Sequence, residues 1–255
     1  MQRSSEDPGD EADGVPGSSL PDPVLIVGGS GRTGCQLAER LVPHVGVRVL
    51  ARDAVRARER LPDDCEVCEG SVLRRPTLKA ALEGVACVVL MNAGDATWQN
   101  RPELVDVLGT RHLLEQMDPE AAVLLVSSIA VTRPEHAFDT DPFSLAWKAG
   151  GEELVRMSSR RYAIVRPGWL VDGKRRPGIR LGQGDVLDGR LSRNALAEVC
   201  LQMLRCEEVW GKTFEVVEGT DPWPVDWCSD FAELESDMEV STKTLKARGA
   251  EVSEI

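Results

Sequence analysis

The sequence is poor in positive charge. Lys and Arg number 30 against 42 Asp and Glu in 255 residues, which gives a formal net charge of −12 at pH 7. Nucleic acids and anionic membrane surfaces are bound through basic patches. The charge balance therefore argues against a general nucleic-acid binder or membrane-surface protein, and it leaves small anionic ligands possible through local sites.

Long hydrophobic runs are also missing. No stretch approaches the ~20 apolar residues that a membrane helix needs, so we expect no membrane span. Residues 1–22 are acidic and rich in Gly, Pro and Ser. They lack the apolar core of a signal peptide and the basic bias of a transit peptide, which predicts a disordered tail. A second polar tail is expected over residues 241–255, and the length and apolar content between the tails predict one domain, residues 23–240.

Pairs of cysteines and metal-ligand clusters are scarce. The seven cysteines are an odd number, so a closed disulfide framework is not expected, and the cytoplasm or another reducing, soluble compartment fits better. Cys65 and Cys68 form a lone C-x-x-C, for which a zinc or redox role is the less favoured interpretation. None of His44, His112 and His136 has metal-ligand spacing, and no metal site is predicted.

Short apolar strands alternate with helical patterns from residue 23 to residue 218. The expected strands are VLIVGG, VRVLAR, EVCEGSV, ACVVLMNAG, AVLLVSS, YAIVRP and KTFEVV. Strands that alternate with helices form a parallel sheet covered on both faces, and strands buried on both faces are apolar throughout, as these are. The sequence therefore predicts a doubly wound α/β domain, with helices on both faces of one parallel sheet.

The first expected strand leads directly into a glycine-rich loop and then a helix. Glycines at this spacing let the backbone turn tightly and approach a phosphate, and the helix N-terminus offers unpaired N–H groups. The position between strand and helix favours a dinucleotide over a ligand-free turn. The residues predicted to bind it here are Gly28, Ser30, Gly31, Arg32, Thr33 and Gly34.

The end of the second strand indicates which dinucleotide binds. An NAD site usually has Asp or Glu there, and this chain has Arg52. A guanidinium suits a 2′-phosphate, because it is always charged and can pair with two phosphate oxygens. Arg32 could add a second positive charge, whereas Asp53 is most simply a helix cap. NADP(H) is therefore favoured over NAD(H).

Several segments together carry a family likeness. They are VLIVGGSGRTG, VRVLARD, VDVLGTRHLL, VLLVSSIAV, WKAGGEELVRMSSRRYAIVRPGWL and GKTFEVVEG. Over residues 24–218 the chain resembles the atypical short-chain dehydrogenase/reductases, and within them the NmrA-like NAD(P)-binding type that includes flavin and biliverdin-IXβ reductases. The resemblance implies a Rossmann-type fold with a small C-terminal substrate or lid region. It leaves the activity open, because this group includes reductases, redox-sensing regulators and assembly factors.

The resemblance also implies catalytic positions. Reductases of the parent family use a serine after the fifth strand together with a Tyr and a Lys spaced Y-x-x-x-K. The serine falls on Ser128, with Ser127 beside it, and the lysine falls on Lys148, where it would hold the nicotinamide ribose. The tyrosine position holds Ser144, and the chain's one tyrosine, Tyr162, belongs to the next strand.

Ser144 and Lys148 lie one turn apart on the same helix face. A serine hydroxyl holds its proton too tightly for efficient general acid catalysis at neutral pH. One hypothesis is an NADPH-dependent reductase whose conjugated or aromatic acceptor (a flavin, quinone or hydroxyaryl ketone) takes its proton from water or supplies its own acid. The other is a non-catalytic NADP(H)-sensing regulator or assembly factor, with a protein partner. We favour the enzyme.

Further positions follow from the resemblance. Ser71 and Val72 follow the third strand, where relatives receive adenine. The residues expected near the nicotinamide are Asn92, Ala93 and Gly94 after the fourth strand, and Pro167 and Gly168 before Trp169 at the end of the sixth.

Residues 172–190 correspond to the family's substrate lid and contain turn residues throughout. The cationic cluster of Lys174, Arg175 and Arg176 would suit a small anionic or phenolic acceptor, although such clusters are more often solvated faces.

Overall fold

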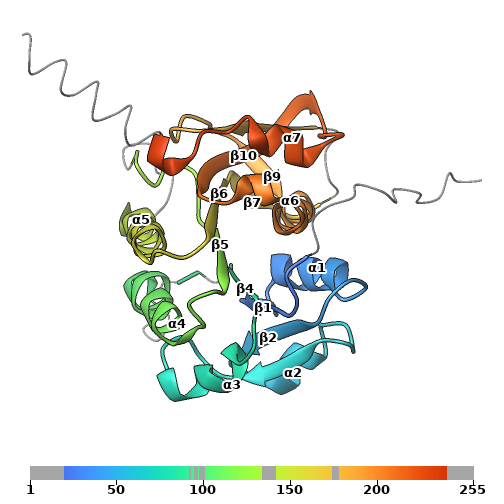
Figure 1. Ribbon diagram of the computed structural model, residues 1–255, viewed down its shortest axis with the longest axis vertical. Coiled ribbons are helices and arrows are strands. Elements are labelled where there is room, and N and C mark those ends of the chain that lie inside the picture. The colour runs from blue at the N-terminus through green and yellow to red at the C-terminus, as the bar shows by residue number, and fades with distance from the viewer. Residues whose placement is uncertain are drawn as a thin grey trace, which may run out of the picture.

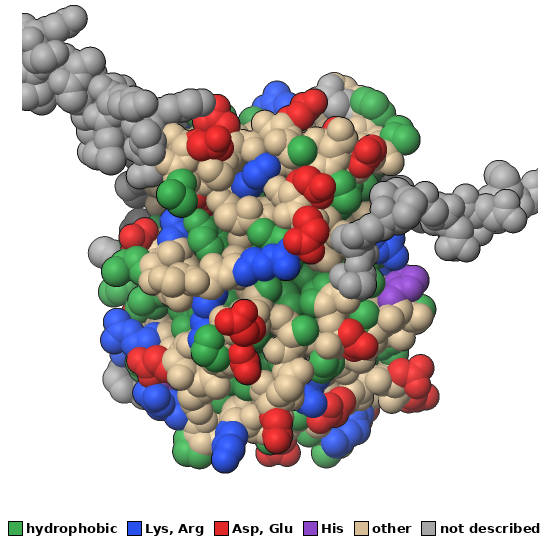
Figure 2. Space-filling model, viewed as in Figure 1, with side chains coloured by type: hydrophobic (Ala, Val, Ile, Leu, Met, Phe, Trp, Pro, Cys, Tyr) green, Lys and Arg blue, Asp and Glu red, His purple; other side chains and the backbone are tan. Residues whose placement is uncertain are grey.

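The computed structural model describes residues 20–91, 93–94, 97, 101–133, 142–173 and 178–239 (Figure 1). The expected tail over residues 241–255 and nearly all of that over residues 1–22 lie outside these ranges. No helix in the described part of the chain is long and apolar enough to cross a membrane. On the face drawn in Figure 2, acidic and basic side chains are interspersed.

One large sheet organises the domain. In chain order the strands are β1 (Val24–Val27), β2 (Val47–Ala51), β3 (Glu66–Glu69), β4 (Cys87–Leu90), β5 (Ala122–Val126), β6 (Tyr162–Pro167), β7 (Trp169–Val171), β8 (Gly178–Gly182), β9 (Arg190–Ser192) and β10 (Lys212–Pro222). The sheet order is β3-β2-β1-β4-β5-β6-β10-β8, and a small second sheet pairs β7 with β9. Every pairing is parallel except that of the edge strand β8 with β10.

Helices cover both faces of the sheet (Figure 1). The helical segments are α1 (Arg32–Leu41), α2 (Ala54–Arg58), η1 (Arg75–Thr77), α3 (Leu78–Leu82), η2 (Glu103–Gly109), α4 (Thr110–Gln116), α5 (Pro142–Met157), α6 (Arg193–Arg205), η4 (Glu207–Val209) and α7 (Trp227–Ala232). Side chains of α1, α2, α6 and α7 belong to one apolar core, and those of α3, η2, α4 and α5 belong to the other.

Successive side chains along the central strands of the sheet point alternately into the two apolar cores. In β1, Val24 and Ile26 face the first core, and Leu25 and Val27 face the second. All four are at most 2% exposed, as a parallel strand covered on both faces requires. The predicted doubly wound α/β fold is confirmed.

The structure adds details that the sequence pattern did not predict. The helical segment that begins at Glu103 is π-helical as η2 and becomes α-helical at Thr110. Within the expected lid, residues 178–182 form the edge strand β8 rather than a turn.

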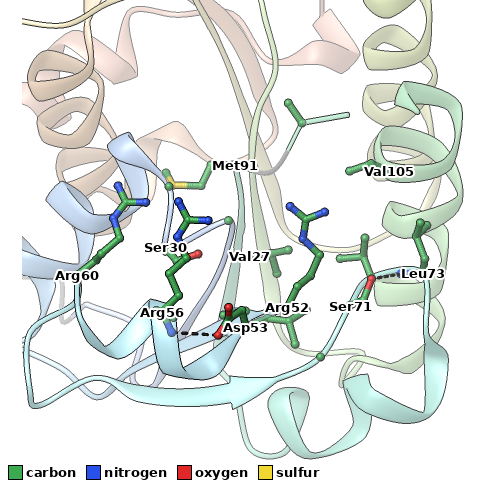
Figure 3. A pocket seen from close by; sticks show the side chains of 18 residues that line it. Val27, Ser30, Arg52, Asp53, Arg56, Arg60, Ser71, Leu73, Met91 and Val105 are labelled. Atoms are coloured by element: carbon green, nitrogen blue, oxygen red, sulfur yellow. Dashed lines mark hydrogen bonds between the residues drawn. The ribbon is translucent and has the colours of Figure 1, made fainter. Parts of the chain in front are cut away.

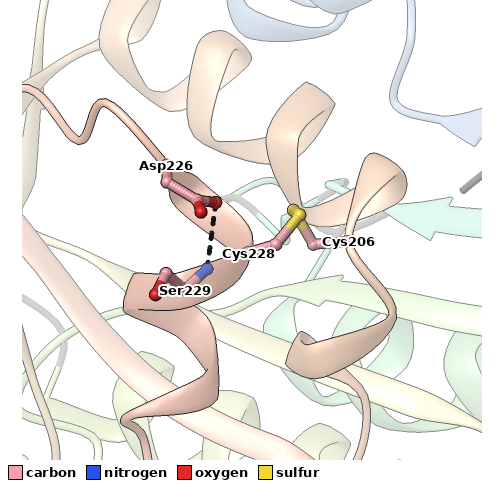
Figure 4. The surroundings of a disulfide bond; sticks show 4 residues. All are labelled: Cys206, Asp226, Cys228 and Ser229. Carbon is pink, nitrogen blue, oxygen red and sulfur yellow. Dashed lines mark hydrogen bonds between the residues drawn. A yellow bond between two sulfur atoms is a disulfide. The ribbon is translucent and has the colours of Figure 1, made fainter. Parts of the chain in front are cut away.

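One disulfide joins Cys206, at the end of α6, to Cys228 in α7 (Figure 4), with the two Cα atoms 5.1 Å apart. The odd cysteine count gave no indication of this single bond. Five other cysteines of the described chain are free thiols. The bond fixes α7, which also has an N-cap, Asp226, that accepts a hydrogen bond from Ser229 N.

A buried ionic network ties α5 to the sheet and to the C-terminal segment. The Arg166 guanidinium on β6 pairs with both oxygens of Glu152, at 2.9 and 2.6 Å. Arg156 joins Glu152 to Asp237, and the Tyr162 hydroxyl donates to the same Asp237 carboxylate at 2.9 Å. Tyr162 is thus a structural residue of this network.

Candidate functional site

The glycine loop forms the turn between β1 and α1. Gly28 has a φ of +90°, a left-handed conformation that favours glycine, and its carbonyl accepts a hydrogen bond from Gly31 N. A Cβ on Gly34 would lie 2.4 Å from Gly28 O, so only glycine lets α1 approach the loop this closely. Gly31 is the N-cap of α1 and offers no side-chain cap, and no acidic residue stands in the first turn. The N–H groups of this turn are suited to an anion.

A cavity of about 440 Å³ opens beside this loop, at the carboxyl ends of the first strands (Figure 3). Met91 and Val105 contribute apolar wall, and the end of β2 contributes charge. The predicted cofactor residues that line the cavity are Gly28, Ser30, Gly31, Arg52, Ser71, Val72 and Ala93. Residues up to 65 positions apart in the sequence, Gly28 and Ala93, therefore meet at one site.

Three arginines line the cavity where one was predicted. Arg52 follows β2, Arg56 lies on α2, and Arg60 stands just after α2, and all three side chains line the cavity (Figure 3). Asp53 caps α2 by accepting a hydrogen bond from Arg56 N at 3.0 Å, as predicted. Sequence reasoning missed Arg56 and Arg60, although two arginines four residues apart in the helical pattern AVRARERL, just after Arg52, were a usable signal.

The Arg32 side chain takes a different direction. It pairs with Asp172, just after β7, at 2.6 Å, and Asp172 also accepts from Arg193 at 2.8 Å. Arg32 is not among the residues that line the cavity. The positive charges that accompany Arg52 in the cavity therefore come from Arg56 on α2 and Arg60 after it, not from the glycine loop.

Lys148 lies on α5 beside a buried acid. Its ammonium donates to Asp106 Oδ1 at 3.2 Å, and Gly94 N donates to Asp106 Oδ2, also at 3.2 Å. Asp106 is only 8% exposed. Two predicted residues, Lys148 and Gly94, are thus joined by a carboxylate that sequence reasoning missed, although an Asp within the apolar run ELVDVLG was a signal for it.

The two serines after β5 differ in exposure. Ser127 is buried, and its Oγ has no hydrogen-bond partner among the described residues, whereas Ser128 is half-buried. Ser127 shares a small cavity of about 10 Å³ with Asp106, Thr110 and Lys148. Ser144 is half-buried on α5, one turn before Lys148.

The turn after β6 brings Gly168 against the residue that precedes β9. Gly168 N donates to Val216 O at 2.9 Å, and a Cβ on Gly168 would lie 2.7 Å from Gly189 O. Pro167 ends β6, and Trp169 begins β7 half-buried. Glycine at position 168 therefore permits the close contact between this turn and Gly189, just before β9.

Five of the residues singled out in the sequence lie outside the described residues. They are Asn92, His136 and the basic cluster of Lys174, Arg175 and Arg176.

The C-x-x-C cysteines lie on β3 and beside it. Burial, reinforced by Asp64, raises the pKa of Cys65 to about 11, and burial also raises that of Cys68. Both side chains are therefore protonated thiols at neutral pH, the unreactive form.

Comparison with known proteins identifies the family. The model of the NAD(P)H-binding family matches residues 28–207. The chain therefore belongs to the NAD(P)H-binding family, and the resemblance to the atypical short-chain dehydrogenase/reductases is confirmed.

Three of the curated relatives come from plants. An uncharacterized chloroplastic protein of Arabidopsis thaliana is 26% identical over 83% of this chain and 75% of its own length. A second uncharacterized chloroplastic Arabidopsis protein is 28% identical, with 76% of each chain covered. The sanguinarine reductase of Eschscholzia californica is 25% identical over 76% of this chain and 88% of its own.

Solved structures share the fold at lower identity. A putative NAD-dependent epimerase/dehydratase from Bacillus halodurans has a TM-score of 0.70 and 20% identity, and covers 83% of this chain and 99% of its own. The anaerobillin reductase ChuY of Escherichia coli O157:H7 has a TM-score of 0.66 and 18% identity, with 77% and 97% covered. A short-chain dehydrogenase/reductase from Veillonella parvula, solved in complex with NADP, has a TM-score of 0.64 and 17% identity, with 81% and 100% covered.

Proposed function

We propose that the protein is an NADPH-dependent reductase that acts on a small conjugated or aromatic acceptor. The observation that carries the proposal is the pairing of an arginine-lined dinucleotide cavity with a lysine, Lys148, held near the loop that follows β4. Membership of the NAD(P)H-binding family and a relative named as a reductase support it. When bound, NADPH supplies a hydride from its nicotinamide ring.

The cavity fits NADPH better than NADH. Arg52, Arg56 and Arg60 contribute three positive charges, against the single carboxylate of Asp53, which is already engaged as the cap of α2. An NAD site would place a free carboxylate at the end of β2 to bind the ribose hydroxyls. A 2′-phosphate instead carries negative charge and acceptor oxygens that match guanidinium groups.

The roles of the other residues follow from their positions. The uncapped N-terminus of α1 with its glycine loop would hold the pyrophosphate. Lys148 would hold the nicotinamide ribose, and Ser128 would orient the acceptor. The lid, residues 172–190, would cover the acceptor, and its basic cluster favours an anionic or phenolic one.

We assign no residue to the general-acid role that the tyrosine has in the parent family. Burial and the Asp237 carboxylate raise the pKa of Tyr162, which makes this hydroxyl a poor acid, and Asp237 already accepts its proton in a hydrogen bond. Ser144 holds its proton too tightly for that role. An acceptor that stabilises the added electron pair by conjugation, such as a quinone or a flavin, can take its proton from water.

The second candidate is a non-catalytic NADP(H)-sensing regulator or assembly factor. The observation that favours it is Ser144 at the tyrosine position of α5. Under either candidate we expect a soluble compartment, and the chloroplastic names of two relatives are compatible with such a location.

Steady-state oxidation of NADPH against FMN, simple quinones and hydroxyanthraquinones tests the proposal. We expect turnover with at least one acceptor class, and loss of that turnover in Lys148→Ala even at saturating NADPH. Lys79→Ala, an exposed lysine of α3, is the matched control and should retain it. NADPH binding without oxidation by any acceptor would favour the regulator instead.

A further inference from the structure

The buried carboxylate of Asp106 has no place in the catalytic set that the sequence suggested. We propose that Asp106 is a positioning residue: it fixes the Lys148 ammonium against the loop after β4, so that the lysine can hold the nicotinamide ribose without help from a neighbouring tyrosine. The inference rests on the proposed NADPH binding and assigns a further residue to that same site.

The geometry joins three elements through one side chain. Asp106 belongs to η2, Lys148 to α5, and Gly94 to the loop after β4. One carboxylate oxygen accepts from Lys148 Nζ and the other from Gly94 N, both at 3.2 Å. Because each oxygen has its own partner, Asp106 sets the distance between α5 and the loop that is expected beside the nicotinamide ribose.

The packing of α5 against η2 makes this contact possible. A Cβ on Gly151 would lie 2.7 Å from Asp106 O, so a larger residue on this turn of α5 would push the two helical segments apart. Lys148 lies one turn earlier on α5. Glycine at position 151 thus brings Lys148 within hydrogen-bonding distance of the acid.

Two adjacent residues of the π-helical segment η2 line different cavities. Val105 lines the cofactor cavity, and Asp106 lines the small cavity with Lys148 and Ser127. Short π-helical segments occur frequently at functional sites. Damage to the fold of η2 would therefore disturb the cofactor cavity through Val105, whereas loss of the Asp106 charge alone would act through Lys148.

The surroundings make the pair sensitive to a change of charge. Asp106 is 8% exposed and the Lys148 side chain 18% exposed, so solvent screens their interaction only weakly. The unpartnered Oγ of Ser127 faces the same small cavity, whose volume of about 10 Å³ is near the minimum for one water molecule. A polar, enclosed setting of this kind holds a lysine in one orientation.

Asp106→Asn separates charge from shape. A carboxylate accepts from two donors at once, but an amide has one oxygen and an NH₂ group that only donates. In the variant, either Lys148 or Gly94 N must therefore face a donor. Loss of a hydrogen bond between charged groups in a buried site corresponds to about a tenfold change in an equilibrium constant or more.

The test compares two ligands by calorimetric titration. NADPH contains the nicotinamide ribose, whereas 2′,5′-ADP contains only the adenine end with its 2′-phosphate. In Asp106→Asn we expect roughly tenfold weaker NADPH binding and unchanged 2′,5′-ADP binding. The matched control is Glu198→Gln, which breaks an ion pair with Arg40 whose side chains are each 21% exposed, and it should bind both ligands as the wild type does.

The outcomes separate the two proposals. Equal binding of NADPH by Asp106→Asn and the wild type, or equal weakening of both ligands, overturns the positioning role and leaves the proposed function intact. Failure of the wild type to bind either ligand overturns both. Should Asp106→Asn not fold, Asp106→Glu keeps the charge but moves the oxygens, and it is expected to give the same selective loss to a smaller degree.

A double variant tests whether Asp106 affects NADPH binding through Lys148. If Asp106 acts through Lys148, adding Asp106→Asn to Lys148→Met should weaken NADPH binding no further than Lys148→Met does alone. Additive losses would show that Asp106 acts independently of the lysine, which contradicts the proposal.

Discussion

Replacement of Arg52 by Gln tests the origin of cofactor choice. Arg52 lies at the end of β2 and lines the cofactor cavity, where its guanidinium would pair with the 2′-phosphate. A hydrogen bond between charged groups contributes about 1.5–3 kcal/mol. Because Arg52 is exposed in the free protein, we take the lower end of that range, which corresponds to about tenfold weaker NADPH binding.

The assay is a fluorescence titration with NADPH and, in parallel, with NADH. Arg52→Gln should weaken NADPH binding and leave NADH binding within about twofold, because NADH has no 2′-phosphate. Arg58→Gln provides the matched control: this arginine lies on α2, six residues after Arg52, is exposed and does not line the cavity. Equal losses for the two cofactors, or no loss for either, would refute the assignment of the arginines to the phosphate.

Three other perturbations probe the scaffold. Replacing both cysteines of the Cys206–Cys228 disulfide by Ser should lower the free energy of unfolding by about 3 kcal/mol in urea titrations, since the bond closes a loop of 22 residues; an unchanged midpoint would contradict this. Tyr162→Phe should leave the rate of NADPH oxidation unchanged, and a loss of turnover would contradict the purely structural role given to this tyrosine. Arg166→Met should destabilise the fold by about 3 kcal/mol in the same titrations, because the buried Glu152 carboxylate loses its bidentate partner and keeps only Arg156, and Glu152→Gln added to it should recover part of the loss.

The parts of the fold that depend on local pattern could be predicted from the sequence. The apolar strands and the glycine loop are contiguous in the chain, and each constrains its own backbone. The α/β order, the turn at Gly28 and the cap at Asp53 followed from such local rules.

The details that depend on tertiary contacts could not be predicted. The direction of Arg32 depends on Asp172, which lies 140 residues away, and the role of Asp106 depends on α5 packing against η2. The π-helical turns of η2 have no simple periodicity that distinguishes them from an α-helix in the sequence. Likewise, an odd number of cysteines does not indicate that two of them meet at the end of α6.

Single-turnover oxidation of protein-bound NADPH tests the central claim, that this chain transfers a hydride, most directly. The protein is loaded with NADPH or with NADPH deuterated at the transferred position, mixed with a quinone, flavin or hydroxyanthraquinone, and followed in the absorption band of the reduced nicotinamide. We predict that the band decays with at least one acceptor and decays more slowly with the deuterated cofactor. A band that persists with every acceptor, while NADPH remains bound, would contradict the account.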